Sequence, residues 1–483
     1  MKVLSVCSEM FPLIKTGGLA DMTGALPGAL AGQGVDMRVL LPAYRGVALS
    51  LESCTELAAL DLPLGRAGLR HCRMQGIDIF LLDAPALYDR PGGPYLDAAG
   101  QEHPDNWKRF ALLAQAAAAI ACGALPGWVP DVVHAHDWQA GLCAACLRAQ
   151  DSETPVIQTI HNVAFAGRFP AAIFPELGLP EGFFGIDGVE FYGDVSFLKA
   201  GLAFSDLVTT VSPTYAEELT RPAMGGGFDG LLRARGADLV GILNGLDSGE
   251  WNPESDPLII RQYTASRLGQ RQVNRNSLYT AFALEDGRPL VAMVSRLTDQ
   301  KGVDLVFDAA GDIIGRGFNL IILGAGDEAH ETRALAVGSA HPGRAGVHVG
   351  YVVAVAHRIH AGTVGLLVPS RLEPCGLTQM CALRYGALPI VAPTGGLVDS
   401  VIDASPVALA QNVATGLHLR EVSAAGILFA LDRLTAILAN PPCHQQMIRN
   451  AMKTDVSLDR TAAEYAALYS RFHQSEPRVR ALA

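Results

Sequence analysis

The sequence predicts an α/β protein with two doubly wound domains, each a parallel sheet between layers of helices. Short aliphatic and β-branched runs recur along the 483 residues. They are bounded by Gly, Pro or Asn and separated by segments of helix length, which is the pattern of βα units. The runs are apolar at nearly every position, as in strands covered on both faces. The chain is also longer than a single hydrophobic core usually serves, so more than one domain is expected.

The predicted strands form two series. The first comprises residues 3–7, 37–41, 77–82, 132–135, 156–160 and 207–211. The second comprises residues 239–243, 290–294, 320–323, 347–349, 366–368 and 390–392. We place the domain boundary near Gly241, before Asn244-Gly-Leu-Asp247.

Composition excludes several classes of protein. Hydrophobic residues make up 49% of the chain and charged residues 18%, so global disorder is excluded. The net charge of −11 argues against a surface for nucleic acid or anionic lipid, and an anionic ligand must meet a local cluster of cations. The most apolar stretch, residues 110–129, is mostly Ala and contains Gly and Pro, which favours a core helix over a membrane span.

The cysteines and the first residues predict a cytoplasmic protein. The nine cysteines are odd in number and scattered, as in a reducing compartment. Cys143 and Cys146 lack a second pair to complete a zinc site, so we expect them to pack in the core. Glu9 interrupts the first apolar run before it reaches the length of a signal peptide.

A six-residue pattern occurs twice. Thr16-Gly-Gly-Leu-Ala-Asp21 is echoed by Thr394-Gly-Gly-Leu-Val-Asp399, each a few residues beyond a predicted strand and at the start of a helix. Glycines there let backbone amides approach a ligand, and a helix N-terminus favours an anion. The alternative is a plain glycine-rich turn before a helix.

A pair of cations follows the predicted strand 290–294. Arg296 and Lys301 lie in one loop, and ligands of open α/β sheets bind beyond the carboxyl ends of the strands. Arg can grip two oxygens at once and Lys acts as a movable point charge, which suits a diphosphate. The alternative is two solvated loop cations.

An acid follows the predicted strand 366–368. Glu373 lies on a turn before Pro374 and Gly376, and the amides after it open a helix. A carboxylate beside such amides can hold sugar hydroxyls while the amides hold phosphate. The alternative is an ordinary acidic helix start.

Polar residues also end two strands of the first domain. His134 and His136 share one strand face, but no third metal ligand is positioned by sequence and no Asp-X-Asp pair occurs, so no metal is expected. His161 and Asp137 are interpreted as polar residues at a cleft rim, with core or capping roles as the alternative.

One nucleotide-binding motif lacks its confirming context, and a second is absent. Residues 324–329 match a dinucleotide fingerprint, but no acid ends the next strand. A nicotinamide cofactor is therefore not expected, and no Gly-X4-Gly-Lys-Ser/Thr phosphate loop is present.

Taken together, these residues resemble the bacterial glycogen synthases, the ADP-glucose-using family shared with starch synthases. The motifs that carry the resemblance, in order, are residues 15–21, 92–95, 105–110, 134–138, 159–162, 194–199, 244–247, 295–302, 323–327, 369–379 and 394–397. The resemblance implies the GT-B architecture of two Rossmann-type domains facing a central cleft. The domains would be residues 1–240 and 241–457, and residues 458–483 would be a helix that crosses back to the first domain.

The resemblance also implies roles for individual residues. Arg296 and Lys301 would hold the diphosphate of ADP-glucose, helped by amides near Gly18 and Thr378. Glu373 would hold hydroxyls of the transferred glucose, His161 its 6-hydroxyl, and Tyr351 would stack on adenine. The remaining residues that would line the cleft are Lys15, Asp21, Tyr95, Asp137, Asn162, Asn244, Gln300, Cys375, Gly376 and Leu377.

Several positions depart from the family pattern. They are Asp299 in place of Trp, Val352 and Val353 in place of a polar-acidic pair, Val364 in place of Asp, Pro393 in place of an Arg, and Leu458 in place of Trp. None of them removes a residue assigned to the donor, but they affect the donor loop and the docking of the last helix.

The resulting expectation is a cytoplasmic, retaining glucosyltransferase that adds glucose from ADP-glucose to the 4-hydroxyl at the non-reducing end of an α-1,4-glucan. No cofactor, nucleic-acid partner or membrane association is expected. The sequence allows a homo-oligomer but does not predict the oligomeric state. The departures motivate one alternative, an inactive glucan-binding or regulatory paralogue. A related transferase using UDP-glucose is the other.

Overall fold

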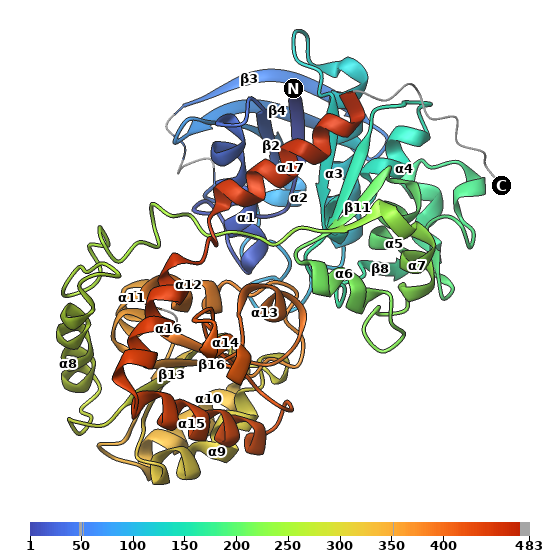
Figure 1. Cartoon of the computed structure of the whole chain (residues 1–483). Helices are drawn as coiled ribbons and strands as arrows, with labels where there is room; N and C mark the ends of the chain where they lie inside the picture. Colours follow the sequence, from blue (N-terminus) through green and yellow to red (C-terminus); the bar gives the residue numbers. More distant parts are fainter. Residues whose placement is uncertain (48–50, 52, 351, 474–483) are drawn as a thin grey trace. The chain divides into compact units, whose positions relative to one another are not determined.

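The computed structural model describes residues 1–47, 51, 53–350 and 352–473. The chain forms two compact units (Figure 1). Unit 1 is Met1–Ile242 together with the segment from Leu458 onward, and unit 2 is Leu243–Ser457.

In the described part of the chain, unit 1 is built on a nine-stranded sheet. In spatial order they are β12 (Leu239–Gly241), β11 (Leu207–Thr210), β7 (Val156–Ile160), β6 (Val132–His136), β1 (Lys2–Val6), β2 (Asp36–Pro42), β5 (Ile77–Asp83), β4 (Gly65–Met74) and β3 (Cys54–Leu62). The strands from β12 to β5 are parallel, and β6, β1 and β7 are buried almost throughout because helices cover them.

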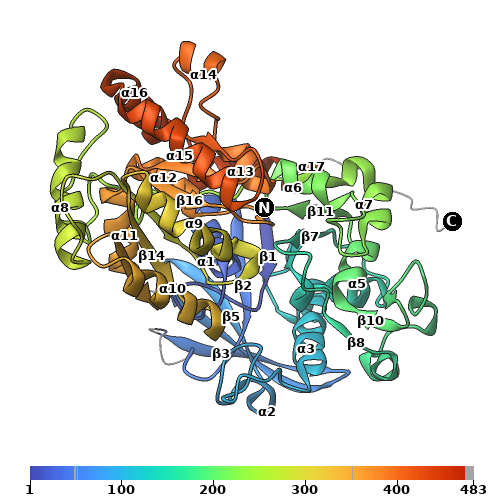
Figure 2. The same cartoon turned by 90° about the horizontal axis from the view of Figure 1, so that it is seen from below.

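Two features of this sheet differ from the prediction. The run at 239–243, assigned to the second domain, forms β12 and pairs with β11 in the first sheet. The edge opposite β12 is an antiparallel hairpin of β3 and β4, which pairs antiparallel with β5 (Figure 2). The hairpin escaped prediction because Cys54–Leu62 is mostly exposed, and its one apolar run, residues 57–60, is short and lacks β-branched residues.

Helices complete unit 1. They are α1 (Gly18–Ala31), α2 (Pro85–Tyr88), α3 (Asn106–Ala119), α4 (Cys143–Arg148), α5 (Phe197–Phe204), α6 (Pro213–Leu219), α7 (Asp229–Arg235) and α17 (Leu458–His473). The stretch at 110–129 is largely α3 and a π-helical turn to Ala124, and its buried face confirms a core helix. A small antiparallel sheet of β8 (Arg168–Pro170), β10 (Asp194–Ser196) and β9 (Glu190–Phe191) precedes α5.

The last helix packs in unit 1, although the chain reaches it from unit 2. α17 lies beside α1 (Figure 1). Leu458, Tyr465 and Tyr469 join Leu26 and Leu30 of α1 in one buried cluster over β1, β6 and β7. Leu458, one of the departures from the family pattern, is 7% exposed and fills this core with an aliphatic side chain.

Unit 2 has a parallel six-stranded sheet within the described residues. In spatial order its strands are β15 (Ala345–Val349), β14 (Asn319–Gly324), β13 (Leu290–Val294), β16 (Gly365–Val368), β17 (Leu388–Val391) and β18 (Leu417–His418). Its helices are α8 (Arg271–Ala281), α9 (Val303–Gly315), α10 (Glu328–Ala340), α11 (Val353–Gly362), α12 (Thr378–Tyr385), α13 (Gly395–Ser400), α14 (Pro406–Ala410), α15 (Ala424–Leu438) and α16 (Pro441–Lys453). α9 contacts α10 and α15 (Figure 2), and α11 contacts α8 and α12, so the sheet is doubly wound as predicted.

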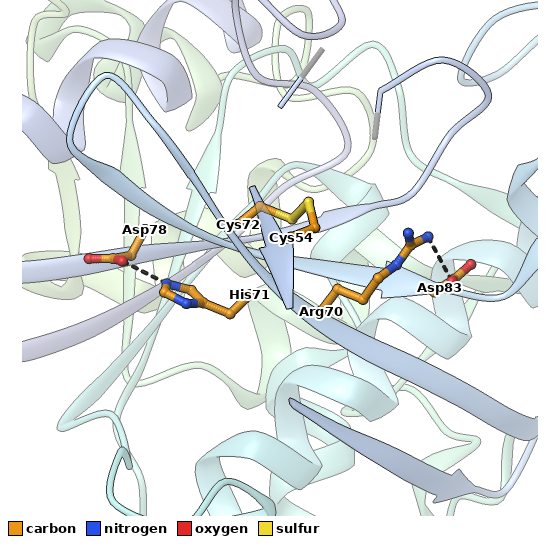
Figure 3. The surroundings of a disulfide bond; sticks show 6 residues. All are labelled: Cys54, Arg70, His71, Cys72, Asp78 and Asp83. Atoms are coloured by element: carbon orange, nitrogen blue, oxygen red, sulfur yellow. Dashed lines mark hydrogen bonds and ion pairs between the residues drawn. A yellow bond between two sulfur atoms is a disulfide. The ribbon is translucent and has the colours of Figure 1, made fainter. Parts of the chain in front are cut away.

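Two of the cysteines are joined in a disulfide, which their odd number and scattered positions did not predict. Cys54 and Cys72 lie opposite each other in the β3–β4 hairpin, with Cα atoms 4.3 Å apart, and form a disulfide (Figure 3). Arg70 pairs with Asp83 and His71 with Asp78 on either side of it. Cys143 and Cys146 are free and buried, as expected for core residues.

In the described part of the chain, no single helix is both long and apolar enough to cross a membrane. α15 and α16 pass that test together by length and composition only, and they meet at a bend of 112°.

Candidate functional site

In unit 2, the loops that follow β13 and β16 are joined directly. The Arg371 guanidinium binds both carboxylate oxygens of Asp304, at 2.7 Å each, and donates to the backbone oxygen of Asp299 at 2.6 Å. Gln300 Nε2 donates to the Leu372 oxygen at 3.1 Å. Since β13 and β16 are neighbours in the sheet, these contacts fix the loop of the predicted cations against the loop of the predicted acid.

The closest contact between these loops joins two predicted site residues. Lys301 Nζ lies 2.6 Å from Glu373 Oε2, and the two side chains are 17% and 7% exposed. Ser370 Oγ donates to the same carboxylate oxygen at 3.0 Å. The acid therefore orients the lysine, and its other oxygen, Oε1, has no donor among the described residues and can accept from a ligand.

Arg296 behaves differently. Its side chain is exposed, and among the described residues it has no hydrogen-bond or ion-pair partner. A guanidinium in this position is available to a bidentate anion such as a phosphate.

Glycines allow the supporting backbone to approach closely. Gly302 adopts φ +67°, and a Cβ there would lie 2.2 Å from the Pro369 oxygen. Gly395, in the second copy of the glycine pattern, adopts φ +44°, and its Cβ would meet the Glu373 oxygen at 2.0 Å. The Gly396 amide donates to that same oxygen at 3.2 Å, so the second copy holds the Glu373 turn.

The residues around the start of α12 form the rest of this group. Cys375 is buried, which raises the pKa of its thiol to about 12 and keeps it protonated. The Asn244 backbone contacts that sulfur, and residue Asn244 is 6% exposed. Its buried Oδ1 has no hydrogen-bond partner among the described residues, so it can accept a bond from a ligand. Gly376, Leu377 and Thr378 lead into α12 beside it. Tyr351 lies outside the described residues.

In unit 1, predicted site residues gather where β1, β6 and β7 end. These parallel strands are neighbours, so their carboxyl ends share one edge. Asp137 follows β6 with φ +53° and ψ −168°, a conformation that costs on the order of 1–3 kcal/mol for a residue with a side chain. Its Oδ1 accepts the amides of His161 at 2.7 Å and Asn162 at 3.3 Å. Burial raises the pKa of this carboxyl to about 7.

The His161 ring is held in place by contacts that run through His136 to Ser5. Its Nε2 lies 3.0 Å from His136 Nδ1, and His136 Nε2 lies 3.1 Å from Ser5 Oγ. Burial lowers the pKa of His161 to about 3, so the ring is neutral at physiological pH. His136 therefore fixes the orientation of the His161 ring, with one of the two rings donating to the other. In the same cluster, His134 bonds Tyr469 of α17 and Thr159.

Lys15 and Asp21 flank the first copy of the glycine pattern. Lys15 Nζ lies 2.6 Å from Asp21 Oδ1 and 5.2 Å from the centre of the Phe11 ring. Burial raises the pKa of Asp21 despite its bond to Lys15. Gly18 is the first residue of α1, and the Tyr95 hydroxyl contacts Ser8 at 2.8 Å and also Glu9.

The structure thus forms two groups of predicted residues. Lys15, Gly18, Asp21, Tyr95, Asp137, His161 and Asn162 lie in unit 1. Asn244, Arg296, Gln300, Lys301, Glu373, Cys375, Gly376, Leu377 and Thr378 lie in unit 2. Within the described chain, no cluster of three or more His, Cys, Asp or Glu residues could hold a metal ion.

Comparisons with known proteins show the family of the chain. The starch synthase catalytic domain family matches residues 2–234, and the glycosyl transferases group 1 family matches residues 278–454. The glycogen synthase of Rhizobium etli is 49% identical over 473 residues, which cover 97% of this chain and 98% of that protein. The chain belongs to the glycogen synthase family.

Further relatives agree with this assignment. The glycogen synthase of Methylocella silvestris is 49% identical over 474 residues, covering 97% of this chain and 98% of that one. The catalytic domain of starch synthase IV from Arabidopsis thaliana, solved with ADP and acarbose, is 28% identical with a TM-score of 0.88, covering 98% and 99% of the two chains. Sucrose-phosphate synthase from Thermosynechococcus elongatus, at 16% identity and a TM-score of 0.61 over 98% and 100%, shares the GT-B fold. This member of the glycogen synthase family is therefore a glycosyltransferase with the predicted fold.

Sequence reasoning missed the residues that hold the site residues in place. Arg371 lies within a quoted motif of the glycogen synthase family, but its partner Asp304 is 67 residues away in sequence. For His136 the sequence suggested only a metal ligand, which was not expected, and gave no sign that it supports His161. Glu9 was noted only as a break in an apolar run. The signal that could have found it is a lone acid just beyond a buried strand.

Proposed function

We propose that the protein transfers glucose from ADP-glucose to the non-reducing 4-hydroxyl of an α-1,4-glucan, with retention of configuration. The observation that supports this most is the Lys301–Glu373 pair in the same loops as the exposed Arg296, in a glycogen synthase family member. A departing diphosphate needs cations, and in a chain of net charge −11 they must be local.

The proposed step needs no nucleophile from the protein. The acceptor hydroxyl oxygen bonds to C1 of the glucose as the bond from C1 to the phosphate oxygen breaks, and the hydroxyl proton passes to the leaving phosphate on the same face. Arg296 and Lys301 stabilise the charge that develops on that phosphate. Glu373 holds sugar hydroxyls, and the neutral His161 ring bonds the 6-hydroxyl. Tyr351 would stack on adenine.

None of the positions that depart from the family pattern replaces a residue assigned to the donor. Val364 is 2% exposed and, like Leu458, lies in a core. The exposed Asp299 carboxylate contacts His330 at 3.1 Å. Pro393 and Val352 are exposed. These placements favour an active enzyme over a regulatory paralogue.

The decisive experiment is labelled glucose transfer to glycogen from ADP-glucose and from UDP-glucose. We expect ADP-glucose to be preferred, and we expect activity to survive EDTA because side-chain cations take the place of a divalent ion. Equal or better turnover of UDP-glucose would overturn the donor assignment. Inactivity of the folded protein with both donors would favour the regulatory paralogue, and a strict need for magnesium or manganese would overturn the charge arrangement.

We further propose that the protein works in the cytoplasm on soluble substrates, without nucleic acid, membrane or cofactor. Fractionation of cells that express the chain tests its location. Light scattering of the purified protein tests whether it forms a homo-oligomer.

A further inference from the structure

Glu9 lies directly behind the first copy of the glycine pattern. Glu9 follows β1 in the chain and is 3% exposed. One carboxylate oxygen, Oε2, accepts the backbone amides of Thr16 and Gly17, the latter at 3.2 Å. The other, Oε1, accepts the Thr16 hydroxyl at 2.5 Å and the Tyr95 hydroxyl. One buried carboxylate thus binds groups from two separate segments of unit 1.

The surroundings of Glu9 are rigid. Its backbone oxygen accepts the Thr23 hydroxyl of α1 at 2.6 Å. The Tyr95 backbone is tied to α3, because Asn106 donates to the Tyr95 oxygen at 3.0 Å and Arg109 to the Pro94 oxygen at 2.7 Å. The carboxylate therefore has fixed supports on both sides.

The buried Glu9 carboxylate is stabilised by hydrogen bonds and not by an ion pair with a described residue. Among the described residues, no Lys, Arg or His forms an ion pair with Glu9, and its charge contributes to the raised pKa values of Asp21 and Asp137. Burying a carboxylate is unfavourable, and hydrogen bonds from amides and hydroxyls compensate for it here. A turn that is only structural does not need a buried carboxylate. We therefore infer that the position of the Thr16–Gly18 backbone must be fixed for function.

The bonds to Glu9 leave specific amides available. Glu9 occupies the amides of Thr16 and Gly17, whereas those of Gly18 and Leu19, the first of α1, have no acceptor among the described residues. The first amides of a helix are donors for an anion. The loop is thus held in a form that presents the next two amides.

We propose that Glu9 is a positioning residue of the transfer reaction: it fixes the Thr16–Gly18 backbone so that the amides of Gly18 and Leu19 can bind phosphate oxygens of the donor, and it fixes the Tyr95 hydroxyl. The inference rests on the proposed function for the identity of the donor. The hydrogen bonds of the Glu9 carboxylate go to groups of the protein, so Glu9 acts through the loop and through Tyr95.

Two variants separate the charge of Glu9 from its shape. In Glu9→Gln the amide oxygen can still accept from the backbone, and the two hydroxyls can turn to accept from its NH2 group. In Glu9→Ala all four bonds are lost. The matched control is Asp206→Asn, which breaks the 2.7 Å Arg148–Asp206 ion pair at the opposite, amino end of β11.

We expect Glu9→Ala to lower kcat/KM for ADP-glucose by about 10- to 100-fold, because bonds to a charged acceptor are lost. Glu9→Gln should lie between it and the wild type, KM for glycogen should be unchanged, and Asp206→Asn should keep wild-type kinetics. Wild-type kcat/KM in Glu9→Gln and Glu9→Ala, with a lowered Tm, would overturn the proposal. If Glu9→Ala does not fold, an unchanged kcat/KM in Glu9→Gln overturns it.

Hydrogen exchange of the peptide that contains Thr16 and Gly17 gives a second readout, independent of turnover. We expect faster exchange there in Glu9→Ala than in Asp206→Asn, and unchanged exchange would overturn the proposal. If the wild type does not use ADP-glucose, the proposed function fails, and the exchange result still decides whether Glu9 fixes the loop.

Discussion

The contact between Lys301 and Glu373 joins two loops, so both side chains are already in position before the reaction begins. Such preorganised charge is worth more in a water-poor site than a mobile surface charge. The exposed Arg296 completes the group with a second cation that the protein itself leaves unpaired among the described residues. The roles of these three side chains can be separated by single substitutions.

Lys301→Ala should lower kcat by about 10²–10³-fold, because charge on the leaving group develops mostly in the transition state. The measurement is steady-state kinetics with varied ADP-glucose. Lys453→Ala, at an exposed lysine of α16, is the matched control and should not change kcat. A raised KM with preserved kcat would make Lys301 a docking contact and contradict the electrostatic account.

Glu373→Gln should lower kcat by about 10²-fold or more, because the shape is kept while the charge that orients Lys301 and the sugar hydroxyls is lost. Kinetics and Tm are measured together. If both equal those of the wild type, Glu373 has only a packing role.

At the scale of elements, the Arg371–Asp304 contact joins the start of α9 to the loop after β16. Arg371→Ala should lower kcat/KM by about tenfold or more, because the loops of Lys301 and Glu373 lose their shared support. The Tm should change little, since Arg371 is 42% exposed and partly exposed ion pairs contribute little stability. Arg333→Ala removes a similar exposed pair with Asp308 and serves as the control. A large loss of Tm without loss of activity would contradict this role.

The elements also show what the sequence could predict. Apolar runs between Gly, Pro and Asn located the described parallel strands other than β18 to within a residue or two, because buried strands leave that local pattern. β18 has only two residues and left no such run, so it was not predicted. The β3–β4 hairpin left no such pattern and depends on pairing with β5. The positions of Arg296 and Glu373 followed from the strands before them, whereas the Lys301–Glu373 bond depends on β13 and β16 being neighbours. The disulfide likewise depends on strand register.

At the scale of the whole molecule, buried histidines predict sensitivity to acid. Burial lowers the pKa of His134, His161 and His360 from 6.5 to about 3, and that of His136 well below its ordinary value. Between pH 6.5 and 3 the unfolded chain binds protons that the folded chain does not, so stability falls as pH falls. The upper limit is about 1.4 kcal/mol per pH unit for each histidine.

Asp137 acts in the opposite direction. Its pKa is raised from 3.8 to about 7, so its contribution to stability falls as pH rises through that window. The histidines outnumber it, and we expect the Tm from calorimetry to fall as pH is lowered from 6.5 to 4.5. His360→Leu should make the slope shallower. A Tm that is flat or rises toward acid pH would contradict the prediction.

The place of α17 has a consequence for synthesis on the ribosome. Unit 2 is one continuous stretch, so it can fold as soon as its last strand and helices have emerged. Unit 1 is made first, but Leu26 and Leu30 of α1 keep an uncovered apolar face until Tyr465 and Tyr469 arrive more than 400 residues later. A nascent chain of this design exposes that face throughout translation of unit 2, which is where a chaperone would bind and where premature termination would lead to aggregation.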